Sequence, residues 1–213
     1  MAQILIFDFD GVIADSETLA NTLLADFLTA EGRPTTLEDS MRLFMGRRWS
    51  DNIPRLEAHL GRTWTADMEA RHRQNSRVRM RAEVEPVAGV LAFIAAKPAM
   101  PKAIASSSSI EWLTDTTRRF GIHNRFENRL FSGTQVPNGK PAPDLFLHAA
   151  QGLAADPKAC IVIEDSPAGI TAARAAGMTA IGLLAGSHIR PGHAEKLVAA
   201  GAHHLCESYA DVA

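Results

Sequence analysis

The order of short apolar segments and helical segments constrains the fold most strongly. Five segments rich in β-forming residues recur along the chain, and each precedes a helical pattern. They are residues 4–9, 102–106, 129–131, 159–164 and 179–183. Their apolar runs are nearly continuous instead of alternating, which is typical of strands buried on both faces. Strands that alternate with helices form parallel βαβ units, so we predict an α/β fold around a parallel sheet.

Helix-capping residues support this alternation. In the segment DSPAGITAARAAG, Ser166 is a suitable N-cap, Pro167 stands at the first helical position, and Gly177 follows the last apolar residues. The segment PAPDLFLHAAQG repeats this pattern between Pro143 and Gly152. Both segments are therefore predicted to be helices that lie between strands.

A long helical insertion interrupts the alternation. Residues 16–83 contain no segment of the strand type. Their first part, SETLANTLLADFLTAEG, places its leucines and a phenylalanine on one helical stripe. We therefore predict two domains. Residues 1–15 and 84–213 form the parallel-sheet core domain, and residues 16–83 form an all-α domain inserted after the first strand.

Composition and charge limit the partners. The 213 residues are 46% hydrophobic, and their net charge of −2 requires no nucleic-acid or membrane partner. No apolar run approaches the length of a membrane span, and the N-terminus lacks the positive segment of a signal peptide. Cys160 and Cys206 are too few for a disulfide framework. We expect a cytoplasmic protein, monomeric or weakly dimeric, that binds neither nucleic acid nor membrane.

Two acids, Asp8 and Asp10, stand at the end of the first apolar segment. Ligands of parallel α/β sheets bind outside the carboxyl ends of the strands. Residues two apart on a strand share a face, so both carboxylates could point into one pocket. Two close carboxylates repel each other unless a cation lies between them, and Mg²⁺ prefers oxygen ligands. The alternative is a turn with solvated acids, because Asp and Gly are common turn residues.

Three further elements follow later in the chain. Glu164 and Asp165 end another apolar segment, directly before a helix start. Ser106 to Ser109 follow the second segment, where hydroxyl and backbone N–H groups could bind an anion. Lys140 stands between a glycine and a proline, as a positive charge suited to phosphate or to carboxylates. Taken singly, these elements also fit a capped helix, a polar turn and a surface lysine.

Taken together, the four elements resemble the signature motifs of the haloacid dehalogenase superfamily of hydrolases. The segments FDFDGVIADSE and IEDSPAGI carry the most specific part of the resemblance, which spans nearly the whole chain. The helical insertion after the first motif resembles the C1 cap of the subfamily that contains β-phosphoglucomutase-like phosphatases. The resemblance implies a Rossmann-like core domain, an inserted helical cap, and a phosphatase of small phosphorylated metabolites such as sugar phosphates or sugar-acid phosphates.

The resemblance also implies roles for individual residues. Asp8 would attack phosphorus and become an aspartyl-phosphate, while Asp10 would protonate the leaving group and then activate water. Ser106 and Lys140 complete the expected catalytic set. The expected phosphate-binding residues are Asp10, Gly11, Ser106, Ser107 and Lys140. The expected ligands of a Mg²⁺ cofactor are the Asp8 carboxylate, the Asp10 backbone carbonyl and Asp165, with Glu164 assisting directly or through water.

Several chemistries of the superfamily are distinguishable by the residues they need. Dehalogenases lack the second aspartate, which this chain has at Asp10. Phosphonatases need a cap lysine for a Schiff base, whereas no lysine precedes Lys97 here. The alternative is a sugar-phosphate mutase of the β-phosphoglucomutase type. Those mutases carry a cap histidine where this chain has Ala20 and a Lys-Asn pair where it has Ser109–Ile110, so we favour the phosphatase.

Arginines in the insertion form two groups. Arg47 and Arg48 precede a predicted helix, and we expect one of them to bind a second anionic group of the substrate. Surface exposure without a function is the alternative. Arginines also recur between residues 71 and 81 with no acid between them. These could form a solvated helix face, a nucleic-acid or partner surface, or a contact to the substrate.

Overall fold

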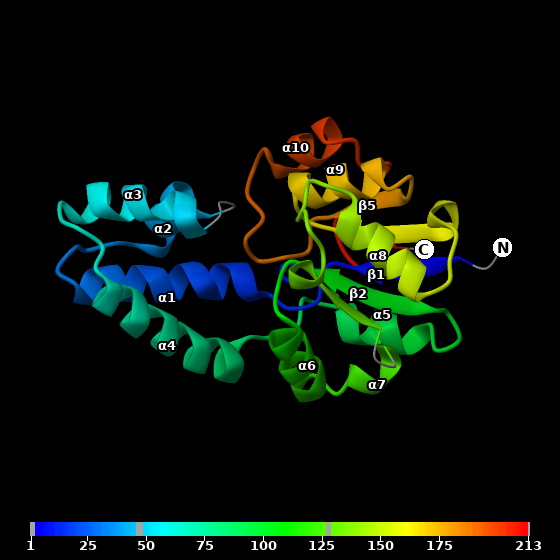
Figure 1. The fold of residues 1–213 in the computed structure, drawn as a ribbon, viewed down its shortest axis with the longest axis horizontal. Helices are drawn as coiled ribbons and strands as arrows, with labels where there is room; N and C mark the ends of the chain where they lie inside the picture. Colours follow the sequence, from blue (N-terminus) through cyan, green and yellow to red (C-terminus); the bar gives the residue numbers. More distant parts are fainter. Residues whose placement is uncertain (1–2, 46–48, 127–128, 213) are drawn as a thin grey trace. The chain divides into compact units, whose positions relative to one another are not determined.

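The structure is a computed structural model, and it describes residues 3–45, 49–126 and 129–212. The chain divides into two compact units (Figure 1). The core unit comprises residues 1–15 and 86–213, and the helical unit comprises residues 16–85.

A six-stranded sheet forms the centre of the core unit, in the order β3-β2-β1-β4-β5-β6. All neighbouring strands are parallel, which confirms the predicted α/β architecture. The strands are β1 (Ile4–Phe7), β2 (Lys102–Ser106), β3 (Leu130–Ser132), β4 (Cys160–Glu164), β5 (Thr179–Leu183) and β6 (His204–Cys206). Chain order runs outward from β1 in both directions, so the topological switch point lies between β1 and β4.

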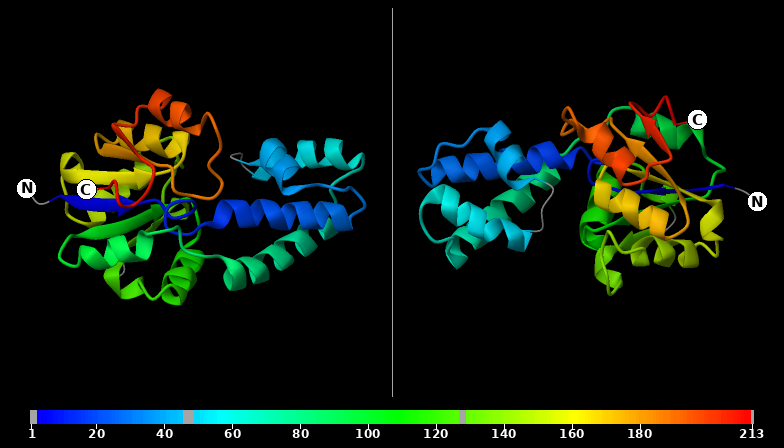
Figure 2. Two further views of the ribbon diagram at one scale, coloured as in Figure 1. Left: turned by 180° about the vertical axis from the view of Figure 1, so that it is seen from behind. Right: turned by 90° about the horizontal axis from the view of Figure 1, so that it is seen from above.

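Helices cover both faces of the sheet, as the two views of Figure 2 show. On one face, Ile6 packs with apolar residues of α8 (Asp144–Gly152), α9 (Pro167–Ala175) and α10 (His193–Ala199). On the other face, the Phe7 ring contacts Phe93 of α5 (Val90–Ala96) and Phe126 of α7 (His123–Phe126). Among the described residues of this unit, the remaining helices are α6 (Ile110–Arg119) and the 3₁₀ helices η1 (Gly133–Gln135) and η2 (Pro157–Ala159). Burial on both faces explains the continuous apolar runs of the strands.

Two details of the sheet differ from the sequence prediction. Strand β1 ends at Phe7, two residues earlier than predicted. A turn follows at residues 11–13, where the Phe9 carbonyl accepts the N–H groups of Ile13 and Ala14 at 2.8 and 2.9 Å. The sixth strand, β6, was not predicted. It has three residues, His204 among them, and pairs only with β5 in the described sheet. A segment this short carries little periodic signal, so tertiary pairing decides its structure.

The helical unit consists of α1 (Ser16–Ala30), α2 (Leu37–Phe44), α3 (Trp49–Leu60) and α4 (Ala66–Glu83) within the described residues. Its core gathers apolar side chains from α1, α2, α3 and α4 and from the α3–α4 connection. They are Leu24, Phe27, Leu28, Phe44, Leu56, Trp64 and Met68. The predicted stripe of α1 therefore faces this core, and Gly32, with φ +89°, follows the helix end. The unit has a hydrophobic core of its own.

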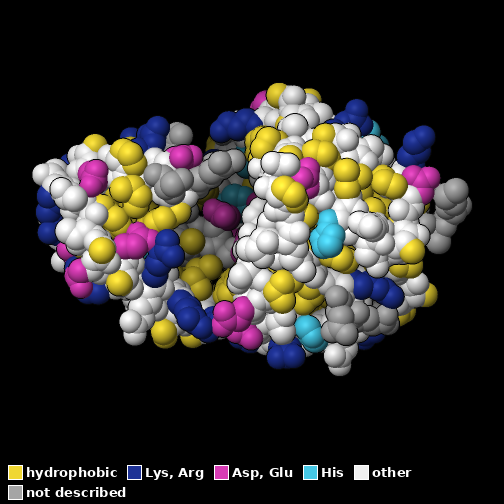
Figure 3. Space-filling model, viewed as in Figure 1, with side chains coloured by type: hydrophobic (Ala, Val, Ile, Leu, Met, Phe, Trp, Pro, Cys, Tyr) yellow, Lys and Arg dark blue, Asp and Glu magenta, His cyan; other side chains and the backbone are white. Residues whose placement is uncertain are grey.

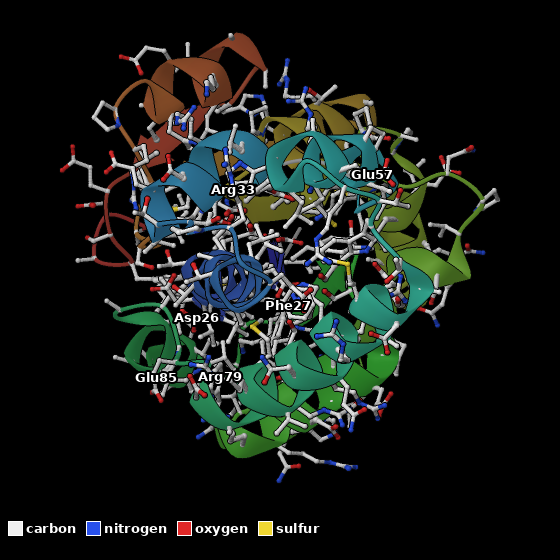
Figure 4. All side chains as sticks on the ribbon, turned by 90° about the vertical axis from the view of Figure 1, so that its left-hand side faces the viewer. Asp26, Phe27, Arg33, Glu57, Arg79 and Glu85 are labelled. Atoms are coloured by element: carbon white, nitrogen blue, oxygen red, sulfur yellow. The ribbon has the colours of Figure 1, made fainter. Side chains whose placement is uncertain are left out.

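The arginines of α4 form ion pairs inside the helical unit. Arg71 pairs with Glu31 at 2.6 Å and with Asp67 at 2.8 Å. Arg79 pairs with Asp26 of α1 at 2.9 Å, and Figure 4 shows these two side chains side by side. In the view of Figure 3, basic and acidic side chains are interspersed over this unit. These contacts favour the interpretation of a solvated helix face.

None of the described helices combines the length and the hydropathy that a bilayer-spanning segment requires.

A buried histidine makes the stability of the helical unit pH-dependent. His72 is 7% exposed and stacks on Trp49 with ring centroids 5.2 Å apart. Burial lowers the pKa of His72 below its ordinary value of 6.5. The Glu69 carboxylate opposes this shift by raising the pKa, and the Arg73 guanidinium adds to it by lowering the pKa. The unfolded chain therefore binds a proton more readily than the folded one, so stability present above about pH 6.5 is lost as the pH falls.

We predict that His72→Phe weakens this pH dependence. Urea unfolding followed by tryptophan fluorescence at about pH 7.5 and about pH 5.5 measures it, because Trp49 and Trp64 lie against His72. The loss of unfolding free energy between the two pH values should be smaller in the variant than in the wild type. The exposed His204 provides the control, and His204→Gln should keep the wild-type loss. An unchanged loss in His72→Phe would contradict the assignment.

Candidate active site

The candidate site lies at the carboxyl ends of β1, β2 and β4, three adjacent strands. Asp8 follows β1 directly, and its N–H donates to the Ile163 carbonyl of β4 at 2.9 Å. Ser106 is the last residue of β2, and Glu164 is the last residue of β4. Asp8 and Ser106 are 98 positions apart in the sequence, and Ser106 and Glu164 are 58 apart, but the parallel register brings the ends of their strands to one edge.

Lys140 connects two of the carboxylates. Its Nζ lies 2.5 Å from Asp8 Oδ1 and 2.7 Å from Glu164 Oε1. The ammonium also lies over the Phe146 ring, 4.9 Å from its centroid. Burial by itself would lower the pKa of Lys140, but attraction to Asp8 and Glu164 outweighs burial and raises that pKa above its usual range. Lys140 is therefore a fixed, charged donor and not a surface lysine.

Asp8, Glu164 and Asp165 form a buried acidic cluster. They can offer one oxygen each, and these oxygens lie within 4.8 Å of one another. Burial raises the pKa of Asp8, and repulsion by Glu164 and Asp165 adds to it while Lys140 opposes it. Burial and repulsion by Glu164 likewise raise the pKa of Asp165. Hard carboxylate oxygens that repel each other fit a divalent cation such as Mg²⁺.

Hydrogen bonds fix both carboxylate oxygens of Glu164. Its side chain is completely buried, and Oε2 accepts hydrogen bonds from the backbone N–H and the hydroxyl of Ser166, each at 2.8 Å. Ser166 caps α9, as its sequence context predicts, and accepts the Gly169 N–H. A Cβ on Gly169 would lie 1.7 Å from Glu164 Oε1, so only glycine leaves room for this carboxylate.

The Asp10 carboxylate points to different partners. Oδ2 accepts a hydrogen bond from Ser108 Oγ at 2.5 Å and a longer one from Ser106 Oγ at 3.4 Å. Oδ1 accepts the indole N–H of Trp112 at 3.1 Å, and the Trp112 ring meets Phe9 edge to face. Asp10 therefore faces the β2–α6 connection, and its carboxylate is not a member of the acidic cluster.

Sequence reasoning did not single out Ser108 or Trp112 as partners of an acid. For Ser106 to Ser109 it left an anion site and a polar turn as alternatives, and in the structure Ser109 caps α6. Only the position of Trp112 in the sequence could have indicated this contact, because Trp112 lies in the first turn of the helix that follows Ser106, a predicted site residue.

The remaining predicted residues differ in backbone conformation, in burial and in whether the structure describes them. Gly11 has φ +82°, and a Cβ there would lie 1.9 Å from Asp165 Oδ2, so both conformation and space require glycine. Ser106 is buried, whereas Ser107 is exposed next to it. Arg47 and Arg48 lie outside the described residues.

The chain resembles known hydrolases over most of its length. Residues 5–183 match the family of haloacid dehalogenase-like hydrolases. The phosphorylated carbohydrates phosphatase of Thermotoga maritima is 32% identical over 84% of this chain and 83% of its own length. The 6-phosphogluconate phosphatase of Escherichia coli is 27% identical over 89% of this chain and 86% of its own length.

A solved structure shows the same fold. The HAD family hydrolase from Deinococcus radiodurans R1, determined with bound phosphate and sodium, has a TM-score of 0.86 and 29% identity. The match covers 99% of this chain and 93% of that chain.

Because Lys140 pairs with two buried acids, we predict that replacing it strongly destabilises the fold. In Lys140→Gln without divalent cations, Asp8 and Glu164 lose their counter-charge, so unfolding free energy should fall by about 3–5 kcal/mol at neutral pH. The loss should shrink at low pH, because protonation removes the repulsion. Urea denaturation in EDTA measures both effects. Lys158→Gln, at an exposed lysine, is the matched control. Equal stability of the two variants would contradict the bridge.

Proposed function

Because the chain belongs to the haloacid dehalogenase-like hydrolase family, we propose that it is a Mg²⁺-dependent phosphatase that works through an aspartyl-phosphate on Asp8. That it is a phosphatase of small phosphorylated metabolites follows from its relatives. The observation that carries the finer proposal is the Lys140 ammonium between Asp8 and Glu164, beside Asp165 at the switch point of the sheet. The Lys140 ammonium supplies the buried Asp8 carboxylate with a positive counter-charge.

Asp8 is the proposed nucleophile. One of its oxygens forms a bond to phosphorus while the bond from phosphorus to the ester oxygen breaks. An anionic carboxylate that approaches a phosphate dianion meets repulsion, and the Lys140 charge, 2.5 Å from Oδ1, reduces it. A second displacement by water at phosphorus then releases phosphate and regenerates Asp8. Two easier displacements replace one difficult displacement.

Asp10 is the proposed acid and base. Protonated, it gives its proton to the leaving ester oxygen in the first step. Ionised, it takes a proton from the attacking water in the second step. Its partners Ser108 and Trp112 keep its carboxylate apart from the acidic cluster. This separation supports a role that differs from those of Asp8 and Asp165.

Phosphate binding is proposed for the ends of β1 and β2. Ser106 and Lys140 would donate hydrogen bonds to the transferring group, with Gly11 and Ser107 beside it. The Asp8 and Asp165 carboxylates and the Asp10 carbonyl would hold Mg²⁺, with Glu164 assisting. When bound, Mg²⁺ would neutralise phosphate charge. The raised pKa values of Asp8 and Asp165 support a cation at this position.

The helical unit is the proposed cap, and it would select the substrate. The proposed class is a sugar phosphate or a sugar-acid phosphate, since relatives named for such substrates span most of the chain. Arg47 and Arg48 stay candidates for a second anionic group. One scaffold hosts many substrates, so the class must be measured directly.

We predict that Asp8→Asn lowers phosphate release by roughly 10⁴-fold or more, because it removes the nucleophile. Phosphate release from a panel of sugar phosphates and sugar-acid phosphates, with Mg²⁺ and after EDTA treatment, measures this. EDTA should abolish turnover and added Mg²⁺ should restore it. Asp67→Asn is the matched control, because that carboxylate lies on the surface of α4, 76% exposed. It should keep wild-type activity.

Two results would contradict the proposal. Wild-type rates in Asp8→Asn would exclude the aspartyl-phosphate, and undiminished turnover in EDTA would exclude the metal. Conversion of glucose 1-phosphate to glucose 6-phosphate without phosphate release would instead establish the mutase.

A further inference from the structure

The connection between β5 and α10 reaches into the candidate site. This segment, residues 184–192, places His188 against Asp165, with Nε2 2.9 Å from Oδ2. Both side chains are buried, at 5% and 6% exposure. The imidazole N–H donates and the carboxylate accepts, so one oxygen of Asp165 has a fixed direction.

A second histidine holds the backbone of the same residue. His193, the first residue of α10, donates its Nε2–H to the Asp165 carbonyl oxygen at 2.6 Å. The two imidazole rings meet edge to face, with centroids 6.0 Å apart. The side chain and the main chain of Asp165 are therefore both bound by residues that follow β5.

Two glycines leave the space that His188 occupies. A Cβ on Gly186 would lie 2.6 Å from His188 Nδ1 and Cε1, although Gly186 does not have a positive φ. A Cβ on Gly11 would lie 2.9 Å from His188 Cε1 and still closer to Asp165. Space for the imidazole, and not backbone conformation, therefore accounts for glycine at position 186.

We propose that His188 is a positioning residue that orients the Asp165 carboxylate for the divalent cation. The inference rests on the proposed function, because it needs a cation at the acidic cluster. A carboxylate ligand can rotate about its Cβ–Cγ bond, and a donor fixed on one oxygen restricts that rotation. Asp165 also faces the repulsive carboxylate of Glu164, which would otherwise turn it away. The His188 hydrogen bond opposes that movement.

The test measures cation binding directly. Isothermal titration of metal-stripped protein with Mg²⁺ alone gives the Kd, and thermal melting gives the stability of each variant. Loss of an outer hydrogen-bond partner typically weakens metal affinity by about 10- to 100-fold. We expect a loss of that size in His188→Ala. In His188→Gln, whose amide N–H can replace the imidazole donor, the Kd should return to within a few-fold of wild type.

Two further variants control the experiment. Gly186→Ala should displace the imidazole and weaken Mg²⁺ binding in the same direction as His188→Ala. His204→Gln changes an exposed histidine of β6 and should leave both the Kd and phosphate release unchanged. Activity measured over a range of Mg²⁺ concentrations should show a raised requirement for Mg²⁺ in His188→Ala, with rates recovering at saturation.

The outcomes separate this inference from the proposed function. A wild-type Kd in His188→Ala, with or without a lower melting temperature, overturns the positioning role and leaves the phosphatase proposal intact. Equal losses in His188→Ala and His188→Gln overturn the hydrogen-bond argument. A wild-type protein that neither binds Mg²⁺ nor needs it for phosphate release overturns the proposed metal dependence itself.

Discussion

The structure of the site depends on the buried ammonium of Lys140. Three carboxylates at the ends of β1 and β4 lie within 4.8 Å of one another, an arrangement that repulsion would disrupt without positive charge. Lys140 bonds to two of them and packs over Phe146 of α8. The connection between β3 and α8 is thereby tied to the centre of the sheet. A charged interaction thus fixes where this loop runs.

The four acids of the site are distinguished by their partners. Asp8 bonds to Lys140, and Glu164 is held by Lys140 and Ser166. Asp165 bonds to His188, whereas the Asp10 carboxylate bonds to Ser108 and Trp112 outside the acidic cluster. Chemically identical groups can take different roles when their hydrogen-bond donors differ. Most of these donors lie in connections that follow β2, β3, β4 and β5, and Trp112 lies in the first turn of α6, so the fold creates the distinction.

The helical unit has its own hydrophobic core and its own ion pairs. Phe27, Leu56 and Trp64 belong to one buried cluster. Arg71 pairs with Glu31, directly after α1, and Arg79 pairs with Asp26 of α1. Its arginines therefore contribute to its internal structure. Surface loops of such a unit can vary while its own core is kept, which agrees with the proposed role of this unit in substrate selection.

The sequence by itself determined the parallel sheet, the helical insertion and the residues at the strand ends. Buried strands need continuous apolar runs, and the carboxyl ends of adjacent parallel strands must meet, so Asp8, Glu164 and Asp165 were predictable. Only the tertiary structure decided that His188 meets Asp165 and that Trp112 meets Asp10, because those contacts depend on the path of the β5–α10 connection and on the placement of α6. The tertiary structure also determined strand β6. Three residues are too few for a recognisable strand pattern, and pairing with β5 makes them a strand.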